Sequence, residues 1–343
     1  MAKPAPLNRS VDIVGDCTPL VAAIDGGGSR TTAAVARVDG TVLGVGSGGP
    51  ANFLSTNKTV ARESVRAALA AARSASGLDG QRLASAAICV AGVGLVQSAA
   101  ALKYVMSAVS AGTVVAASDT DAAWTAAFPF GGAGVIVIAG TGSIVVARNA
   151  DGAGCEVGGW GHLVADEGSG YWIARAGLAA ATRAFDGRDQ QTLLFSTLLE
   201  RLGIRSMGEL REALYVRGLD RRGIADLAPA VFEAADSGDP AAQRIVRNAA
   251  DELVLAVSAA VARLGANAPV PVARFGSLWR SGRLSELFEK RLSRANPGLP
   301  VVEAPMPALG GAVLLAIRAT GRQADEQSIR QVIRTLGSAP SGG

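Results

Sequence analysis

Two glycine-rich turns that carry hydroxyl groups are the parts of this sequence best suited to chemistry. The first reads DGGGSRT at residues 25–31 and the second AGTGS at residues 139–143, and each follows an apolar run. Glycines leave backbone N–H groups uncovered, so these groups can converge on an anion while neighbouring hydroxyls add donors. The candidate phosphate ligands are Gly26, Gly27, Gly28, Ser29 and Thr31 in the first turn, and Gly140, Thr141 and Gly142 in the second.

Two aspartates stand where strands are expected to end, and a third follows two residues after the second. Asp25 closes the apolar run 20–25, and a carboxylate there can organise Mg²⁺, which prefers few carboxylates and keeps several waters. Asp119 closes the run 113–119, where a carboxylate can accept the proton of a substrate hydroxyl as it attacks a phosphoryl group. Asp121 competes for this role, and either residue could instead cap the helix expected from residue 122. We favour Asp119 as the base.

A third glycine-rich stretch, GGWGH at residues 158–162, precedes DEGSGYW at residues 166–172. It places backbone donors beside the flat face of a tryptophan, and the two acids can accept hydrogen bonds from several hydroxyls. Carbohydrate sites combine such polar groups with an apolar surface. His162 is the only histidine, so a Ser–His–Asp triad or a histidine metal cluster cannot form without it.

The elements that must position these residues repeat along the chain. Apolar runs at 20–25, 31–38 and 41–48, separated by the first glycine turn and by an Asp-Gly hairpin signal, predict three strands. Residues 134–152 repeat this order around the second turn. Taken alone, either turn could equally be a glycine-rich hairpin that binds no phosphate. The repeat favours an internal duplication whose two turns face one another across a cleft.

Composition excludes several classes of protein. The 343 residues are 49% hydrophobic and 18% charged, which excludes a disordered, strongly charged chain. The net charge is only +4, and the basic stretch Arg201–Arg222 is interleaved with acids, so we expect a solvated helical face and no nucleic-acid partner. Three cysteines without CxxC spacing argue against a disulfide framework or structural zinc.

The sequence shows no pattern typical of a membrane-spanning segment or an export signal. No apolar segment reaches the roughly 18 residues that a transmembrane helix needs, so no membrane partner is expected. The opening residues are interrupted by Pro, Asn, Asp and Gly, which is typical of a flexible leader rather than an export signal. We therefore expect a cytoplasmic protein.

Together, DGGGSRT, AGTGS and GGWGHLVADEGSGYW resemble the N-acetylglucosamine kinase branch of the BadF/BadG-type ATPase family, within the sugar kinase/actin-like superfamily. The resemblance runs from Val21 to Arg318. It implies an α/β fold of two actin-like (ribonuclease H-like) domains with a duplicated β-sheet core and an interdomain cleft. The expected divisions are a flexible leader at 1–19, an N-terminal domain at 20–123 plus 308–320, a C-terminal domain at 124–307 and a flexible tail at 321–343.

The resemblance also implies roles for single residues. Asp119 falls where the family has its catalytic, substrate-contacting aspartate. Gly276 falls in the adenosine loop, where Phe275 replaces part of a usual glycine pair and bears on nucleotide preference. Ser29 replaces a more usual Thr and keeps the hydroxyl. Sugar contacts are implied for Asn52, Gly159, Trp160, Gly161 and Asp166.

The activity implied is that of an ATP- and Mg²⁺-dependent kinase, acting as a homodimer, that phosphorylates an amino sugar at its 6-hydroxyl. N-acetylglucosamine is the first expectation, and glucosamine and N-acetylmuramic acid stay open. A dehydratase-activating ATPase would need cysteines that hold an iron–sulfur cluster, yet Cys17, Cys89 and Cys155 form no close pair in sequence. A non-catalytic sugar sensor usually carries a DNA-binding helix-turn-helix, for which the leader is too short.

Overall fold

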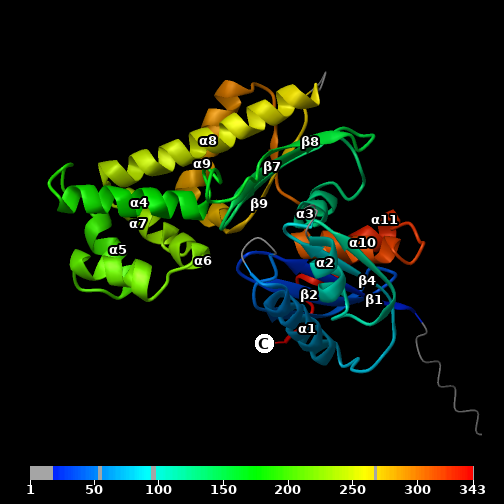
Figure 1. Ribbon diagram of the computed structural model, residues 1–343. Helices are drawn as coiled ribbons and strands as arrows, with labels where there is room; N and C mark the ends of the chain where they lie inside the picture. The colour runs from blue at the N-terminus through cyan, green and yellow to red at the C-terminus, as the bar shows by residue number, and fades with distance from the viewer. Residues whose placement is uncertain (1–17, 53–55, 94–97, 266–268, 343) are drawn as a thin grey trace, which may run out of the picture.

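Two β-sheets, each covered by helices, lie next to each other in the computed structural model (Figure 1). The structure describes residues 18–52, 56–93, 98–265 and 269–342. Almost all of the predicted leader, including Cys17, lies outside these residues. The α/β class and the duplicated sheet core predicted from the sequence are confirmed.

The first sheet has six strands in the order β11-β3-β2-β1-β4-β5. Strands β1 to β3 form an antiparallel meander, whereas β4 and β5 run parallel to β1. At the predicted hairpin, Asp39 Oδ1 accepts a hydrogen bond of 2.8 Å from the N–H of Thr41, which fixes the turn. The strands are β1 (Leu20–Gly26), β2 (Thr31–Arg37), β3 (Val42–Gly48), β4 (Leu83–Val90), β5 (Ala111–Ala117) and β11 (Ser341–Gly342).

The second sheet repeats this topology with five strands in the order β10-β9-β6-β7-β8. Its first three strands again form an antiparallel meander, and β9 runs parallel to β6 as β4 does to β1. The two glycine turns therefore occupy equivalent positions, each between the first two strands of its sheet. The strands are β6 (Gly134–Ala139), β7 (Ser143–Arg148), β8 (Gly154–Gly158), β9 (Val272–Phe275) and β10 (Val301–Val302).

Helices cover both faces of the first sheet because its strands are apolar on both sides. Along β1, Val21 and Ala23 join the apolar core beneath α10 and α11, whereas Ala22 and Ile24 join the core beneath α1. Successive strand side chains point to opposite faces, which explains this division. The helices are α1 (Lys58–Ser76) and α2 (Ser98–Met106) on one face, and α3 (Asp119–Ala127), α10 (Ala308–Arg318) and α11 (Glu326–Leu336) on the other.

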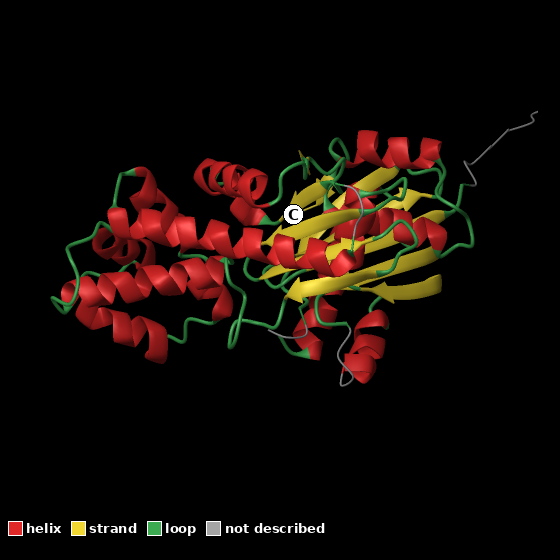
Figure 2. Cartoon of the chain, turned by 90° about the horizontal axis from the view of Figure 1, so that it is seen from above, coloured by secondary structure: helices red, strands yellow, loops and turns green. Residues whose placement is uncertain are grey.

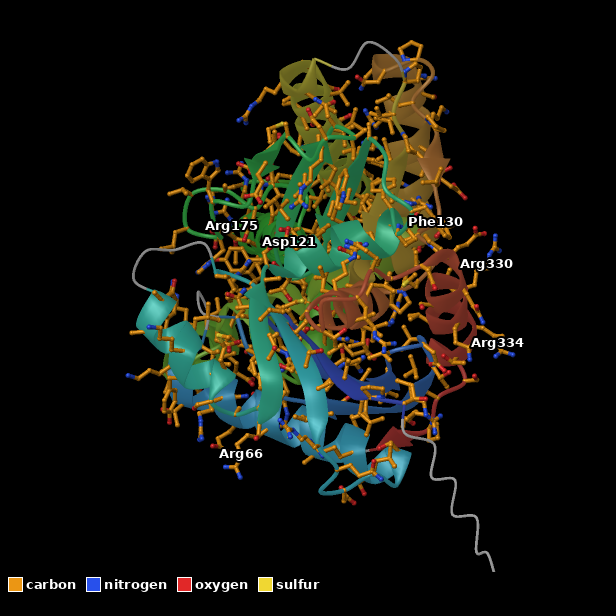
Figure 3. All side chains as sticks on the ribbon, turned by 90° about the vertical axis from the view of Figure 1, so that its right-hand side faces the viewer. Arg66, Asp121, Phe130, Arg175, Arg330 and Arg334 are labelled. Atoms are coloured by element: carbon orange, nitrogen blue, oxygen red, sulfur yellow. The ribbon has the colours of Figure 1, made fainter. Side chains whose placement is uncertain are left out.

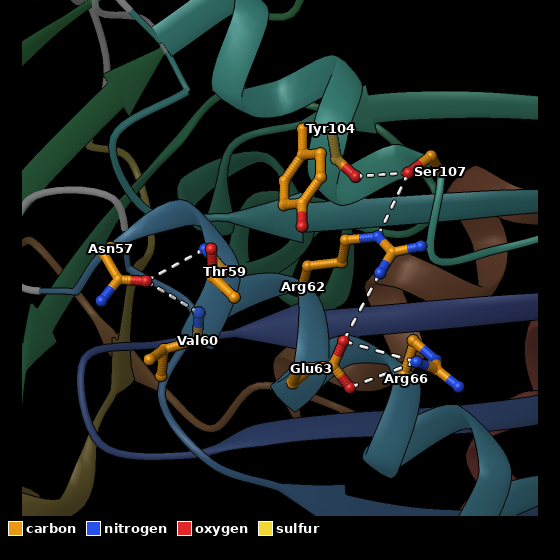
Figure 4. A network of polar contacts seen from close by, with 8 residues as sticks. All are labelled: Asn57, Thr59, Val60, Arg62, Glu63, Arg66, Tyr104 and Ser107. Carbon is orange, nitrogen blue, oxygen red and sulfur yellow. Dashed lines mark hydrogen bonds and ion pairs between the residues drawn. The ribbon is translucent and has the colours of Figure 1, made fainter.

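Helix α1 lies directly on strand β3. A Cβ added to Gly46 would stand 2.4 Å from the Ala68 carbonyl oxygen of α1, so a side chain there would push the helix away. At its start, α1 is capped by Asn57 Oδ1, which accepts hydrogen bonds from two backbone N–H groups. Arg62 Nε donates to Ser107 Oγ at 3.2 Å and ties α1 to the segment that follows α2 (Figure 4).

Helix α3 packs between the two sheets. Ala122 and Ala126 contact the core shared with α10, whereas Ala123 and Ala127 belong to a small core with Ile136 of the second sheet. Positions four apart lie on one face of a helix, so α3 presents a different apolar face to each sheet. The domain boundary predicted between residues 123 and 124 therefore falls inside one continuous helix.

A group of helices lies to one side of the strands (Figure 2). None of the helices in the described residues is both long and apolar enough to span a membrane. The helical segments are α4 (Gly170–Phe185), α5 (Leu194–Leu202), η1 (Met207–Glu209), η2 (Glu212–Val216), α6 (Arg221–Ala225), α7 (Ala228–Asp236), α8 (Pro240–Leu264), η3 (Ser277–Arg280) and α9 (Gly282–Ala295).

The prediction of a flexible tail at 321–343 is wrong over most of that range. Helix α11 buries Ile329, Val332 and Leu336 against the first sheet, while its outer face carries Arg330 and Arg334 outward (Figure 3). Strand β11 then pairs with β3. The composition of the tail is polar, but three apolar residues at helical spacing are enough to anchor it.

Candidate functional site

The tips of the two glycine turns meet. Ser29 Oγ, between β1 and β2, lies 3.0 Å from Thr141 Oγ1, between β6 and β7, which is hydrogen-bond distance. The two turns belong to different sheets and are 112 residues apart in sequence. The structure thus brings together the two candidate phosphate loops from opposite walls of one cleft.

A cavity of about 1130 Å³ opens beside the two turns. Small-molecule sites commonly measure about 300–1,000 Å³, so this space can hold more than one small molecule. Most of the predicted site residues line it, namely Asp25, Gly27, Gly28, Ser29, Asn52, Asp119, Gly140, Thr141, Gly142, Gly159, Gly161, Asp166 and Gly276.

Three predicted site residues do not line this cavity. Gly26 is buried in β1, where a Cβ would stand 2.7 Å from Val90 Cγ1. Thr31 is fully buried and its hydroxyl donates to the Gly49 carbonyl oxygen at 2.7 Å. Trp160 is 80% exposed and lines a separate cavity of about 450 Å³ beside α8. The glycine at 26 and the hydroxyl at 31 thus serve packing in this conformation.

Asp119 and Asp121 have different surroundings. Asp121 forms a capping box with Ser118 and accepts a hydrogen bond of 2.6 Å from Arg148 Nη2. Partial burial alone would raise the pKa of Asp121, but the hydrogen bonds from Arg148 and Ser118 outweigh it and lower this pKa. Its position on α3 is labelled in Figure 3. Asp121 therefore stays ionised and engaged, and it is absent from the lining of the main cavity.

Asp119 instead faces the cavity, and one of its oxygens accepts a hydrogen bond of 3.0 Å from the Thr120 N–H. Removal from water raises the pKa of Asp119 to about 6, against the effect of that hydrogen bond. For Asp25, removal from water and the nearby charge of Asp119 raise the pKa to about 7, while Arg30 opposes the rise. Two carboxylates thus share a poorly solvated region of one cavity wall.

Asp166 is held in a conformation that few residues other than glycine adopt. Its φ is +66°, and it is the one such non-glycine residue in the described part of the chain. The side chain is 3% exposed and its Oδ2 accepts a hydrogen bond of 2.6 Å from Arg221 Nη2. Residues held in this way cluster at binding sites, where the surrounding structure maintains the strain.

Arg221 was not among the residues suggested by the sequence. The expectation that Arg201–Arg222 forms a solvated face is wrong at this position, because α6 packs against α4 and turns Arg221 into the cavity wall with its side chain 12% exposed. Arg222, the next residue, is 47% exposed and follows the expectation. No periodicity in this short helix distinguishes the two arginines, so only the tertiary packing reveals the difference.

Gly276 lies where the turn after β9 passes against the end of β6. Its φ is +105°, and a Cβ there would stand 2.1 Å from the Ala139 carbonyl oxygen, so a glycine is required. The neighbouring Phe275 packs its side chain against apolar core residues. Its ring is not part of the cavity lining in the described residues. The Phe275 side chain, which stands where the family usually has a glycine, therefore does not fill the cavity.

The cavity wall fits a nucleotide and a divalent cation. A Cβ added to Gly27 or Gly140 would meet its nearest neighbour at 3.6 or 4.0 Å, so both turns leave open space for phosphate oxygens. The described residues contain no cluster of three His, Cys, Asp or Glu side chains that could hold a metal. Asp25, beside Asp119, supplies the few carboxylates that Mg²⁺ prefers when phosphates and waters complete its shell.

The whole fold, with two sheets of one topology and a cavity between their turns, has relatives among known proteins. Residues 23–316 match the BadF/BadG/BcrA/BcrD ATPase family, which is most of the chain. The chain belongs to this family. The chain is also similar to the N-acetylmuramic acid/N-acetylglucosamine kinase of Clostridium acetobutylicum, with 30% identity over 303 residues that cover 86% of this chain and 97% of the relative.

Solved structures share the fold of this chain. A protein of Chromobacterium violaceum assigned as an N-acetylglucosamine kinase superposes with a TM-score of 0.74 at 26% identity, covering 87% of this chain and 99% of its own. A ROK family glucokinase from Streptomyces griseus superposes with a TM-score of 0.57 at 18% identity, covering 87% of this chain and 99% of its own. At this identity the likeness shows the fold alone. The family member described here therefore has the two-domain actin-like architecture.

Proposed function

We propose that the protein is an ATP-dependent amino-sugar kinase that phosphorylates N-acetylglucosamine at its 6-hydroxyl. The observation that carries the proposal is the meeting of two glycine turns beside Asp119 in one cavity. The names of the Clostridium acetobutylicum and Chromobacterium violaceum relatives support an amino sugar as the acceptor. N-acetylmuramic acid and glucosamine are the alternative acceptors.

Each part of the cavity has a role in this proposal. The turns at 27–29 and 140–142 hold the phosphates through backbone N–H groups and hydroxyls. Asp119 accepts the proton of the sugar hydroxyl, and its pKa of about 6 leaves it mostly ionised at neutral pH yet basic enough to act. Asp25 helps to hold Mg²⁺, which neutralises charge on the phosphates when it is bound.

In this proposal the sugar binds in the same cavity. Asn52, Gly159, Gly161 and Asp166 line it and offer amide, backbone and carboxylate partners for hydroxyl groups. Asp119 lines this cavity too, which supports its contact with the acceptor hydroxyl. Trp160 points to the neighbouring cavity, and the proposal gives it no sugar contact in this conformation.

A panel of N-acetylglucosamine, N-acetylmuramic acid, glucosamine and glucose tests the proposal in a coupled ATP-consumption assay, with the phosphorylated carbon identified by NMR. We expect turnover with N-acetylglucosamine and a 6-phosphate product. Turnover with N-acetylmuramic acid or glucosamine alone would change the substrate but keep the amino-sugar class. Sugar binding without ATP consumption would indicate a sensor instead.

Two further readouts separate the remaining alternatives. Iron in anaerobically purified protein would indicate a dehydratase activator. Among the described residues, however, Cys89 on β4 and Cys155 on β8 lie in different sheets and offer no pair for a cluster. The homodimer implied by the family resemblance stays a prediction, which light scattering of the purified protein tests.

A further inference from the structure

Arg221 approaches the second glycine turn more closely than any side chain at position 142 would allow. A Cβ added to Gly142 would stand 2.4 Å from Arg221 Nη2 and 3.2 Å from Asp166 Oδ2. The missing side chain of Gly142 therefore makes room for the Asp166–Arg221 pair against the turn. A positive charge is thus placed beside backbone groups that are themselves suited to an anion.

The guanidinium of Arg221 has donors to spare. It offers five N–H groups, and among the described residues its ion pair is with Asp166, through Nη2. Nε is buried and has no acceptor within the described residues. Burying a charged donor without a partner is unfavourable, so this arrangement is incompletely satisfied in the free protein. Arg221 also lines the main cavity, where an incoming oxyanion can supply acceptors.

We propose that Arg221 is a further residue of the transfer reaction and binds oxygens of the γ-phosphoryl group of ATP. The inference rests on the proposed kinase function. Nη2 of Arg221 contacts both the candidate sugar ligand, Asp166, and the place where a Gly142 side chain would stand in the candidate phosphate loop. The γ-phosphoryl is the one phosphate that lies between nucleotide and acceptor, so it is the group that meets a residue next to both sites.

This contact would contribute in two ways. A guanidinium matches phosphate geometry with two parallel N–H···O bonds, which strengthens binding of the triphosphate over the diphosphate. It also stabilises the charge on the phosphoryl oxygens during transfer, as arginines do in other phosphoryl-transfer sites. The pairing with Asp166 meanwhile keeps a carboxylate beside the phosphate loop from repelling the nucleotide.

The test compares Arg221→Gln and Arg221→Lys with Arg222→Gln, a matched control on the same helix whose exposed side chain pairs with Asp226. Calorimetry measures AMPPNP and ADP binding with Mg²⁺, and the coupled assay gives kcat and KM with N-acetylglucosamine. For Arg221→Gln we expect AMPPNP affinity to fall at least about tenfold and kcat at least about a hundredfold. ADP affinity should stay within about twofold. Arg221→Lys should recover part of both losses, and Arg222→Gln should match the wild type.

The Asp166→Asn variant tests whether Arg221 binds the phosphate itself or acts only by orienting the Asp166 carboxylate. If Arg221 merely orients that carboxylate, Asp166→Asn reproduces the loss of AMPPNP over ADP selectivity, and the inference is overturned. We expect instead a raised KM for the sugar with the AMPPNP-to-ADP affinity ratio retained. An Arg221→Gln protein that keeps this ratio and its kcat would also refute the inference. Wild-type protein that neither binds AMPPNP nor phosphorylates an amino sugar would refute the proposed function itself.

Discussion

Replacing Asp119 by asparagine should stabilise the free protein while it abolishes turnover. The carboxylate has little solvent around it, shares its cavity wall with Asp25, and titrates at about 6 rather than at its ordinary 3.8. The folded state therefore binds the proton more tightly than the unfolded chain does. The stability that this proton contributes is complete below pH 3.8 and is lost as the pH rises through 6.

The two pKa values set the size of the effect. Linkage gives an ionisation cost to the folded protein of about 2 kcal/mol at pH 5 and about 3 kcal/mol at pH 8. Because the side chain is partly exposed to the cavity, these values are upper limits. Asparagine does not ionise, so the advantage of the variant over the wild type should grow by up to about 1 kcal/mol between pH 5 and pH 8. Loss of the charge also lowers the pKa of Asp25, which acts in the same direction.

Urea unfolding of both proteins at the two pH values, without nucleotide or metal, measures this difference. In the coupled assay, Asp119→Asn should lose at least about a hundredfold in kcat. Asp121→Asn is the matched control and should be destabilised by about 1 kcal/mol, because it loses the charge that pairs with Arg148 and weakens the helix cap. An Asp119→Asn protein whose advantage stays constant or shrinks from pH 5 to pH 8 would refute the electrostatic reasoning. Near-normal kcat would refute the role as base.

Two further substitutions test the fold around the site. Ile329→Ala should lower the free energy of unfolding in urea by about 2–5 kcal/mol, because the side chain of Ile329 is 2% exposed on the buried face of α11. Ile333→Ala, on the outer face of the same helix, should lower it by less than about 1 kcal/mol, because Ile333 is 36% exposed. Equal effects would mean that α11 is not anchored as described. Gly276→Ala should lower stability and nucleotide affinity together, because its Cβ would collide with the Ala139 carbonyl oxygen at a φ of +105°; calorimetry that finds unchanged AMPPNP binding would contradict this.

The parts of the fold that the sequence could predict are those with a local signal. The strand, glycine turn, strand and Asp-Gly hairpin at residues 20–48 recur at 134–152, and both copies form as the pattern indicates. Repetition is also what made the cleft predictable, since Ser29 and Thr141 occupy equivalent turns. Asp25 lies on β1 as expected, whereas Asp119 begins α3 instead of ending β5, because the helix starts three residues earlier than predicted; both carboxylates nevertheless line one cavity.

The parts that could not be predicted depend on contacts between distant segments. Trp160 stands in a stretch whose composition suits a sugar site, yet the orientation of its ring depends on how residues 158–166 lie against α8. Helix α11 has a polar composition, and its three buried side chains find their partners on strands nearly 300 residues earlier. Arg221 differs from Arg222 only in which way a five-residue helix faces, and the packing of α6 on α4 decides that.

Several features around the cavity cost stability in the free protein, and they share one explanation. Asp25 and Asp119 hold carboxylates where ionisation is disfavoured, Asp166 adopts a left-handed backbone conformation, and Arg221 buries a donor without an acceptor. A sequence selected for stability alone would remove each of them. A divalent cation would stabilise the two carboxylates, and a phosphoryl oxygen would give the guanidinium an acceptor on its cavity side. The unfavourable groups all line one cavity, and together they support the proposal that a metal and a phosphate bind there.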